Sequence, residues 1–153
     1  MKLAEALALR AETTRRVEQL RSRVVANARY QEGEEPAEDA AALLAEAGQA
    51  LDELESLIRR INRTNSAVVL PEGGTLTDAL ARRDVLRLRH AVLSSAAEAA
   101  SGSNAYRQMR SELRMYAALP VAGLRTRIDE LAKQIREVDT LVQRSNWEVD
   151  LLD

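Results

Sequence analysis

The stretch that decides the fold is residues 41–65, AALLAEAGQALDELESLIRRINRTN. Its apolar residues recur at alternating spacings of three and four, which is the period of an amphipathic α-helix. The series runs through Leu44, Ala47, Leu51, Leu54, Ile58 and Ile61, and Asn65 extends it. The stretch therefore predicts one long helix with a single apolar side.

The same spacing returns near the other end of the chain. Pro120 precedes a second regular series, which predicts a helix of similar length. Its members are Leu124, Ile128, Leu131, Ile135, Val138, Val142 and Ser145. A weaker stripe over residues 2–30 predicts another helix, which ends at the glycine and proline of QEGEEP, residues 31–36.

A further predicted helix, residues 76–100, has apolar residues on two sides. Thr75 and Asp78 have the spacing of a capping box, so the helix starts near Leu76 or Thr77. One stripe holds Ala81, Val85, Leu88, Val92 and Ala99, and the other holds Ala79, Leu86, Leu93, Ala97 and Ala100. A helix with two apolar sides needs a cover on both, either at the centre of a bundle or at an oligomer contact.

Two segments between the helices have features of β structure. Residues 68–77 fit either a β-hairpin or a structured loop around a Pro-Glu-Gly-Gly turn. Residues 109–117 alternate apolar and polar, which is typical of a strand, and a strand needs a partner. The sequence thus predicts a mainly α fold. We expect four long antiparallel helices, bundle-like or coiled-coil-like, with a small β-hairpin or short strand, in a single domain over residues 1–153.

Charge supports an antiparallel pairing of the first two helices. The second half of the first helix carries Arg15, Arg16, Arg21, Arg23 and Arg29. Between Gln31 and Ser56 there are nine carboxylates and no Lys or Arg. A short connection makes the two helices antiparallel, so the basic half of one lies beside the acidic half of the other. Each exposed pair contributes a few tenths of a kcal/mol to about 1 kcal/mol.

Composition argues against several classes of protein. The formal net charge of −2 gives no basic footprint for nucleic acid. The absence of Cys excludes disulfides and Cys-ligated zinc. The start, MKLAEALALR, is interrupted by charges too early for a signal peptide, and no apolar run is long enough to span a membrane. We therefore expect a cytoplasmic protein with no nucleic-acid and no membrane partner.

The inventory of catalytic side chains is small. His90 is the only histidine, so no catalytic triad or multi-histidine metal site can be assembled within one chain. The acidic residues between Glu32 and Asp39 lack the ligand spacing of an EF-hand loop. We expect no catalytic residue, no metal and no cofactor.

One polar grouping is a candidate ligand site. If the helices run alternately up and down, the ends of the second and fourth helices and the start of the third lie together. The grouping holds Arg63, Asn65, Arg82, Arg83, Asp84, Asn146 and Trp147. Two interpretations are open: these residues satisfy one another and fix register and oligomeric state, or they bind an unidentified small ligand. The long segment 101–119 also leaves the direction of the last helix open.

Several short stretches resemble a known family. They are KLAEALALRAE (residues 2–12), QEGEEP (31–36), INRTN (61–65), LTDALARRD (76–84) and SNW (145–147). They are similar to an uncharacterised bacterial family often labelled septicolysin, over nearly the whole chain. The resemblance implies a shared fold and, through the label, a cytolysin, but it carries over no catalytic residues. The chain has no Cys, one Trp and no long apolar hairpin, so it lacks the features with which thiol-activated cytolysins enter membranes.

The sequence therefore favours a non-enzymatic structural or interaction protein that forms a homo-oligomer through its helix faces. The alternatives are a ligand-binding protein or enzyme that uses the polar grouping, and a cytolysin.

Overall fold

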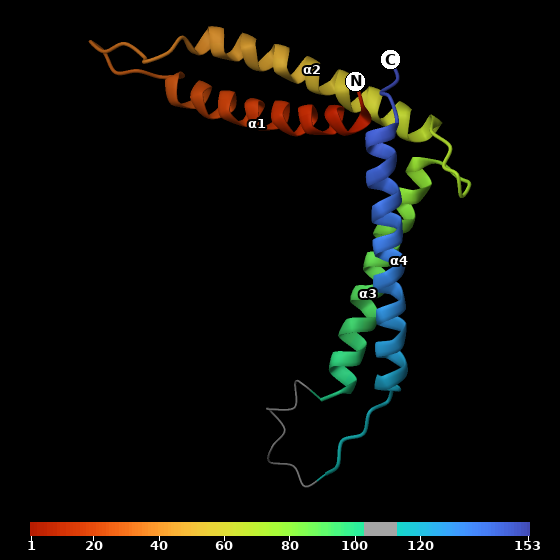
Figure 1. The fold of residues 1–153 in the computed structure, drawn as a ribbon. Helices are drawn as coiled ribbons and strands as arrows, with labels where there is room; N and C mark the ends of the chain where they lie inside the picture. The colour runs from red at the N-terminus through yellow and green to blue at the C-terminus, as the bar shows by residue number, and fades with distance from the viewer. Residues whose placement is uncertain (103–112) are drawn as a thin grey trace. The chain divides into compact units, whose positions relative to one another are not determined.

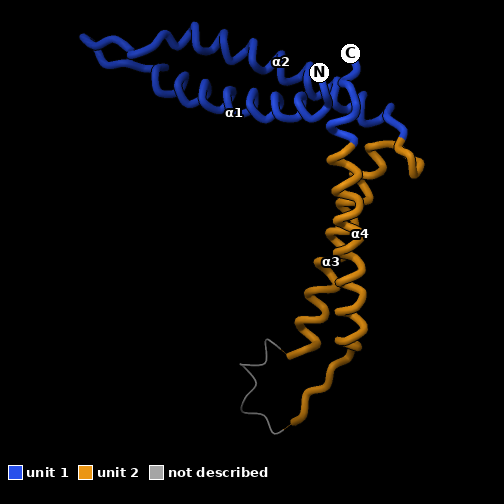
Figure 2. Tube along the Cα trace, in the orientation of Figure 1, with its two compact units in different colours: residues 1–69, 145–153 blue, residues 70–144 orange. Residues whose placement is uncertain are grey.

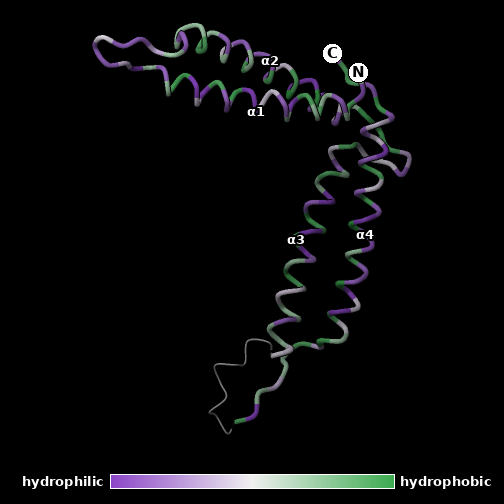
Figure 3. The backbone as a smooth tube through the Cα atoms, turned by 60° about the vertical axis from the view of Figure 1, so that its left-hand side comes forward, coloured by the Kyte–Doolittle hydropathy of each residue, from purple (hydrophilic) through white to green (hydrophobic). Residues whose placement is uncertain are grey.

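The computed structural model describes residues 1–102 and 113–153, and four long helices account for most of them (Figure 1). In chain order they are α1 (Leu3–Asn27), α2 (Ala40–Ala67), α3 (Leu76–Ala100) and α4 (Val121–Glu148). Hydrophobic residues recur along them at helical intervals (Figure 3). The predicted mainly α fold with four long helices is confirmed.

The chain divides into two compact units (Figure 2). Unit 1 comprises Met1–Val69 and Ser145–Asp153, and unit 2 comprises Leu70–Arg144. Helix α4 belongs to unit 2 up to Arg144 and to unit 1 from Ser145 onward. The assignment of the whole chain to a single domain stays a prediction, so each unit is described by itself.

Unit 1 is built on the antiparallel hairpin of α1 and α2 (Figure 1). Part of its core is an aliphatic cluster of Leu20 from α1 with Leu43, Ala47 and Ala50 from α2. Val17 and Val24 pack against this cluster one turn to either side of Leu20. The alanines allow the two helices to approach closely, so a narrow line of side chains is enough to seal the interface.

The buried line of α2 differs from the predicted stripe. Leu43, Ala47, Ala50, Leu57 and Ile61 are buried. Leu44, Leu51 and Ile58 are exposed, Leu44 by 63 %. The prediction of a single buried stripe was therefore wrong for half of its members. The apolar band of α2 is wider than the part that α1 covers.

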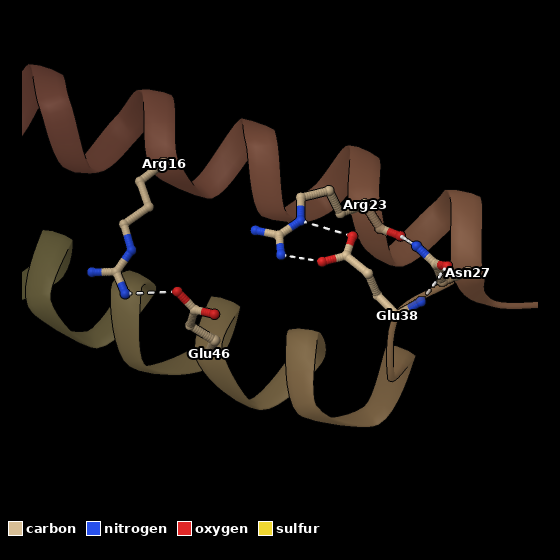
Figure 4. A network of polar contacts seen from close by, with 5 residues as sticks. All are labelled: Arg16, Arg23, Asn27, Glu38 and Glu46. Carbon is tan, nitrogen blue, oxygen red and sulfur yellow. Dashed lines mark hydrogen bonds and ion pairs between the residues drawn. The ribbon is translucent and has the colours of Figure 1, made fainter. Parts of the chain in front are cut away.

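Two ion pairs hold the hairpin together along its edge (Figure 4). Arg16 Nη2 lies 2.8 Å from Glu46 Oε1. Arg23 binds the Glu38 carboxylate with two nitrogens, of which Nε lies 3.0 Å from Oε2. The predicted pairing of the basic half of the first helix with the acidic start of the second is confirmed.

The start of α2 is fixed by two capping side chains. Asp39 is the N-cap and accepts hydrogen bonds from the Ala41 and Ala42 amides at 2.9 and 3.1 Å. Asn27, at the end of α1, accepts a bond from the Glu38 amide at 3.0 Å and donates to the Arg23 carbonyl (Figure 4). These bonds satisfy backbone groups that a helix end leaves open.

Residues 149–153 complete unit 1, although their partners lie far away in sequence. The Leu3 amide donates to the Val149 carbonyl and the Leu151 amide to the Met1 carbonyl, both at 2.9 Å. The Leu152 amide then donates to Thr64 Oγ1 on α2 at 3.0 Å. This terminal segment therefore joins the start of α1 to the end of α2.

Unit 2 contains α3 and the larger part of α4 side by side (Figures 1 and 2). Leu86 of α3 and Leu124, Leu131 and Val138 of α4 are buried. Arg87 Nη2 on α3 donates to both carboxylate oxygens of Asp139 on α4, at 3.0 and 3.1 Å. We call this contact between Arg87 and Asp139 the polar clamp. It lies next to the buried Val138 in the sequence of α4.

The segment that leads into α3 is a tight turn. The Leu70 amide donates to the Gly74 carbonyl and the Gly73 amide to the Leu70 carbonyl, both at 2.9 Å. Gly73 and Gly74 have φ of 91° and 78°, a region that other residues rarely adopt. Residues 68–77 thus form a structured loop with single β-bridge residues, Val69 and Thr75, on its two sides, and not a hairpin of paired strands.

The predicted capping box at the start of α3 is confirmed. Asp78 Oδ2 accepts bonds from the Thr75 amide at 2.7 Å and from the Thr75 hydroxyl at 2.8 Å. These bonds favour the ionised carboxylate and lower the pKa of Asp78.

The predicted strand over residues 109–117 falls partly outside the described residues. Its described part, residues 113–117, forms no strand. A short alternating pattern cannot form a strand without a neighbour to pair with, and local sequence does not reveal that neighbour.

Thr64→Val should destabilise unit 1 by about 1 to 2 kcal/mol, because the Leu152 amide then loses its acceptor in a buried place. Urea unfolding followed by fluorescence of Trp147, the only tryptophan and a member of unit 1, measures this change. Thr14→Val is the matched control, since the Thr14 hydroxyl, like that of Thr64, donates to the carbonyl four residues earlier in its helix, but Thr14 is exposed. Equal effects of the two substitutions would contradict the role given to Thr64.

Unit 1 should also become less stable in acid. The bond from Arg23 lowers the pKa of Glu38 from its ordinary value of 4.5, and the bond from Lys2 lowers the pKa of Asp150 from 3.8. A carboxyl with a lowered native pKa stabilises the fold above its ordinary pKa and loses that effect as pH falls through the native value. The urea midpoint should therefore fall between about pH 5 and about pH 3. Glu38→Gln should flatten this fall, whereas Glu12→Gln at an exposed position should leave it unchanged.

Candidate functional site

The predicted polar grouping is distributed over both units. Arg63 and Asn65 are on α2, and Asn146 and Trp147 are on the last turn of α4, all in unit 1. The other members, Arg82, Arg83 and Asp84, are on α3 in unit 2. That these residues form one ligand site stays a prediction.

The members of the grouping differ in exposure. Asn146 is 9 % exposed, and it continues the line of the buried Val138, Val142 and Ser145 along α4. Trp147 is 64 % exposed, and Arg63, Arg82 and Asp84 are also exposed. Asn146 is therefore the one member that lies within a packed seam.

Arg63 binds residues 149–153. Its Nη1 donates to the Asp153 carbonyl, and the neighbouring Arg60 donates to the Leu152 carbonyl at 3.1 Å and to Asp153 Oδ1 at 2.8 Å. Two arginines one turn apart thus hold the same short segment. The sequence contained no signal for this contact, because it depends on where residues far along the chain return.

Arg83 belongs to the polar clamp between α3 and α4. Its Nε lies 3.3 Å from Asp84 Oδ1 and its Nη1 lies 3.9 Å from Asp139 Oδ1. Asp139 thus receives Arg83 and, through two bonds, Arg87. Sequence reasoning missed Asp139, which could have been found only from the correct register of the two helices.

The described residues offer few groups for chemistry. Across residues 1–102 and 113–153, no three His, Asp or Glu side chains are placed so that they could hold a metal ion. His90 is half-buried on α3, and its Nδ1 lies 3.5 Å from the Ser94 hydroxyl one turn later. Glu38 and Asp39 of the acidic segment are used in the ion pair and the cap described above.

An apolar surface is the more conspicuous feature of α3. We define the outer face of α3 as Ala81, Val85, Leu88, Val92, Ser95 and Ala99, all of which are exposed. Val85, Leu88 and Val92 at its centre are 53, 68 and 67 % exposed. Ala79, Leu86 and Ala97 on the other side of the same helix are buried. Of the two predicted apolar stripes, one is packed and the other is open to solvent.

No helix in the described part of the chain combines the length and apolar character needed to cross a membrane. The cytoplasmic location expected from the sequence stays a prediction.

Comparison with known proteins places the chain in a family. Residues 10–151 match the model of a family of unknown function (DUF6847). A crystal structure described as a functionally unknown conserved protein from Corynebacterium diphtheriae is 38 % identical, with a TM-score of 0.90 over 99 % of each chain. No curated protein matches. The label septicolysin is not borne by either match and stays a resemblance. The chain therefore belongs to the family of unknown function DUF6847.

Proposed function

We propose that the chain is a non-enzymatic structural or interaction protein that forms a homo-oligomer through exposed helix faces. The observation that carries the proposal is the outer face of α3, an apolar line opposite the side of the helix that is already packed. The toxin activity implied by the label septicolysin is not part of it.

Burial of this face would provide a substantial driving force. Single exposed aliphatic residues are common on protein surfaces, but Val85, Leu88 and Val92 lie in register on one side of one helix. Full burial of a Val or Leu side chain contributes about 1.5 to 3 kcal/mol. Three such side chains from each copy would offset much of the entropy cost of association.

Helix α2 offers a second surface of the same kind. Leu44, Leu51 and Ile58 recur every seven residues and are exposed beside the line that packs on α1. Helices α2 and α3 thus each expose aliphatic side chains in addition to those that they bury. This supports self-association over a surface left apolar by chance.

The chemistry of the described residues supports a non-enzymatic role. Arg63, Arg83, Glu38 and Asp39 are each engaged in a contact that holds backbone or helices in place. These four polar side chains are thus used to hold the structure.

A second candidate is binding of a small anionic ligand by the predicted polar residues. Asn146 favours it, since it places a polar amide, 9 % exposed, directly beside the exposed Trp147 on the last turn of α4. Arginine recognises carboxylate and phosphate groups through paired hydrogen bonds. Thermal-shift measurements with phosphate, citrate and nucleotides as probes test it. Arg82→Ala and Asn146→Ala should each abolish a stabilisation that a probe produces, with little change in the melting temperature of the free protein.

The homo-oligomer is tested by Val92→Glu. The native chain should sediment as a dimer or larger species at micromolar concentration, and V92E should raise the dissociation constant at least about a hundredfold, because a charge replaces a side chain that association buries. Val25→Glu is the matched control, since Val25 is exposed to a similar extent on α1 but is flanked by Arg21, Ser22 and Arg29. A compact monomer of the native chain at tens of micromolar would overturn the proposal.

A further inference from the structure

We infer that α3 pairs with α3 of a second copy as a parallel, in-register, two-stranded coiled coil. The inference rests on the proposed homo-oligomer and adds to it the surface, the direction and the register of the contact. Its basis is the outer face of α3 together with the charges on the two flanks of that face.

The outer face follows a heptad repeat from Ala81 to Ala99. Val85, Val92 and Ala99 take the first position of the repeat, and Ala81, Leu88 and Ser95 take the fourth. A β-branched residue at the first position with Leu at the fourth favours two parallel strands. The central part, Val85, Leu88 and Val92, has this arrangement and is also the most apolar.

The charges on the flanks select the same direction. Asp84 and Glu98 lie on one edge of the outer face, at the seventh heptad position, and Arg82 and Arg89 lie on the other edge, at the fifth. In a parallel pair, each seventh position lies beside the fifth position of the next heptad in the partner. Asp84 of each copy then faces Arg89 of the other, which gives two symmetric ion pairs.

The antiparallel alternative places like charges together. In that arrangement fifth positions face fifth positions and seventh positions face seventh positions. Arg82 and Arg89 would then line one edge of the contact with positive charge from both copies, and Asp84 would face no cation. Like charges so placed disfavour the pairing.

Other features of α3 are compatible with the contact. Ala91 and Ala96 occupy the remaining flank positions beside Val92, so the two backbones can come close. Ala79, Leu86 and Ala97 are buried on the opposite side of the helix, so the packing within unit 2 is kept. Asp84 is exposed, and its contact with Arg83 uses one carboxylate oxygen, which leaves the other for a second guanidinium.

Single-cysteine variants test the direction, because the chain has no cysteine of its own. Ala81 and Ala99 lie at the two ends of the outer face, 18 residues or about 27 Å apart along the helix. In the parallel pair A81C should form a disulfide-linked dimer under mild oxidation, A99C should do the same, and a mixture of the two should give no linked heterodimer above the statistical background. Circular dichroism of the reduced variants checks that both are folded.

The outcomes separate the inference from the proposed function. If the native chain is monomeric by sedimentation, both fail. If it is oligomeric but the mixture of A81C and A99C links preferentially, or neither variant links, then the parallel α3 contact is wrong while the homo-oligomer stands.

Charge exchange tests the register. Asp84→Arg and Arg89→Asp should each raise the dissociation constant about tenfold, because two attractive pairs become repulsive. The double variant D84R/R89D should return it to near the native value. Asp129→Arg on the exposed surface of α4 makes the same change of charge away from the contact and should leave the constant unchanged. Failure of the double variant to recover would overturn the register.

Discussion

The structure depends on the burial of one narrow aliphatic line between two paired helices. The chain has no phenylalanine, so its packing relies on Leu, Val, Ile and Ala. In unit 1 the line consists of Leu20 against Leu43, Ala47 and Ala50, and the small residues bring the helices close together. Such a line uses only part of each helix surface, and ion pairs such as Arg16 with Glu46 occupy its edges. A hairpin made in this way leaves the outer sides of its helices free for other contacts.

The periodicity of the sequence was sufficient to predict the helices, because their apolar spacing and end signals are local. The capping box of Thr75 and Asp78 could be predicted for the same reason. The runs of charge predicted that the basic half of α1 lies beside the acidic start of α2, but not which side chains pair. The choice between Leu43 and Leu44 as the buried residue could not, since both lie within one wide apolar band and only the position of α1 decides between them. The apolar pattern of α2 fits two possible buried lines equally well, and the position of α1 selects one of them.

The candidate site was predicted less well than the fold. Residue type drew attention to Arg63 and Arg83, but their partners, Asp153 and Asp139, lie 90 and 56 residues away. A contact over such a separation depends on how the helices are placed, and residue type does not encode that. The two apolar sides of α3 were visible in the sequence because 3.6 residues per turn assigns Leu86 and Leu88 to different sides. Which side would remain open became clear only when α4 was placed.

The pairing of residues 149–153 with the start of α1 has a consequence for how the protein folds. The bond from Lys2 to the Glu148 carbonyl spans 146 residues, so unit 1 cannot be completed until Glu148 and the residues of this unit that follow it have left the ribosome. Contacts this distant in sequence are formed late, because the intervening loop must first be closed. The bond of Arg87 to Asp139 in unit 2 spans only 52 residues, so a smaller loop has to be closed to form it. During synthesis the hairpin of α1 and α2 can thus form before residues 149–153 reach it, and the pairing of these residues with the start of α1 is a late step in the folding of unit 1.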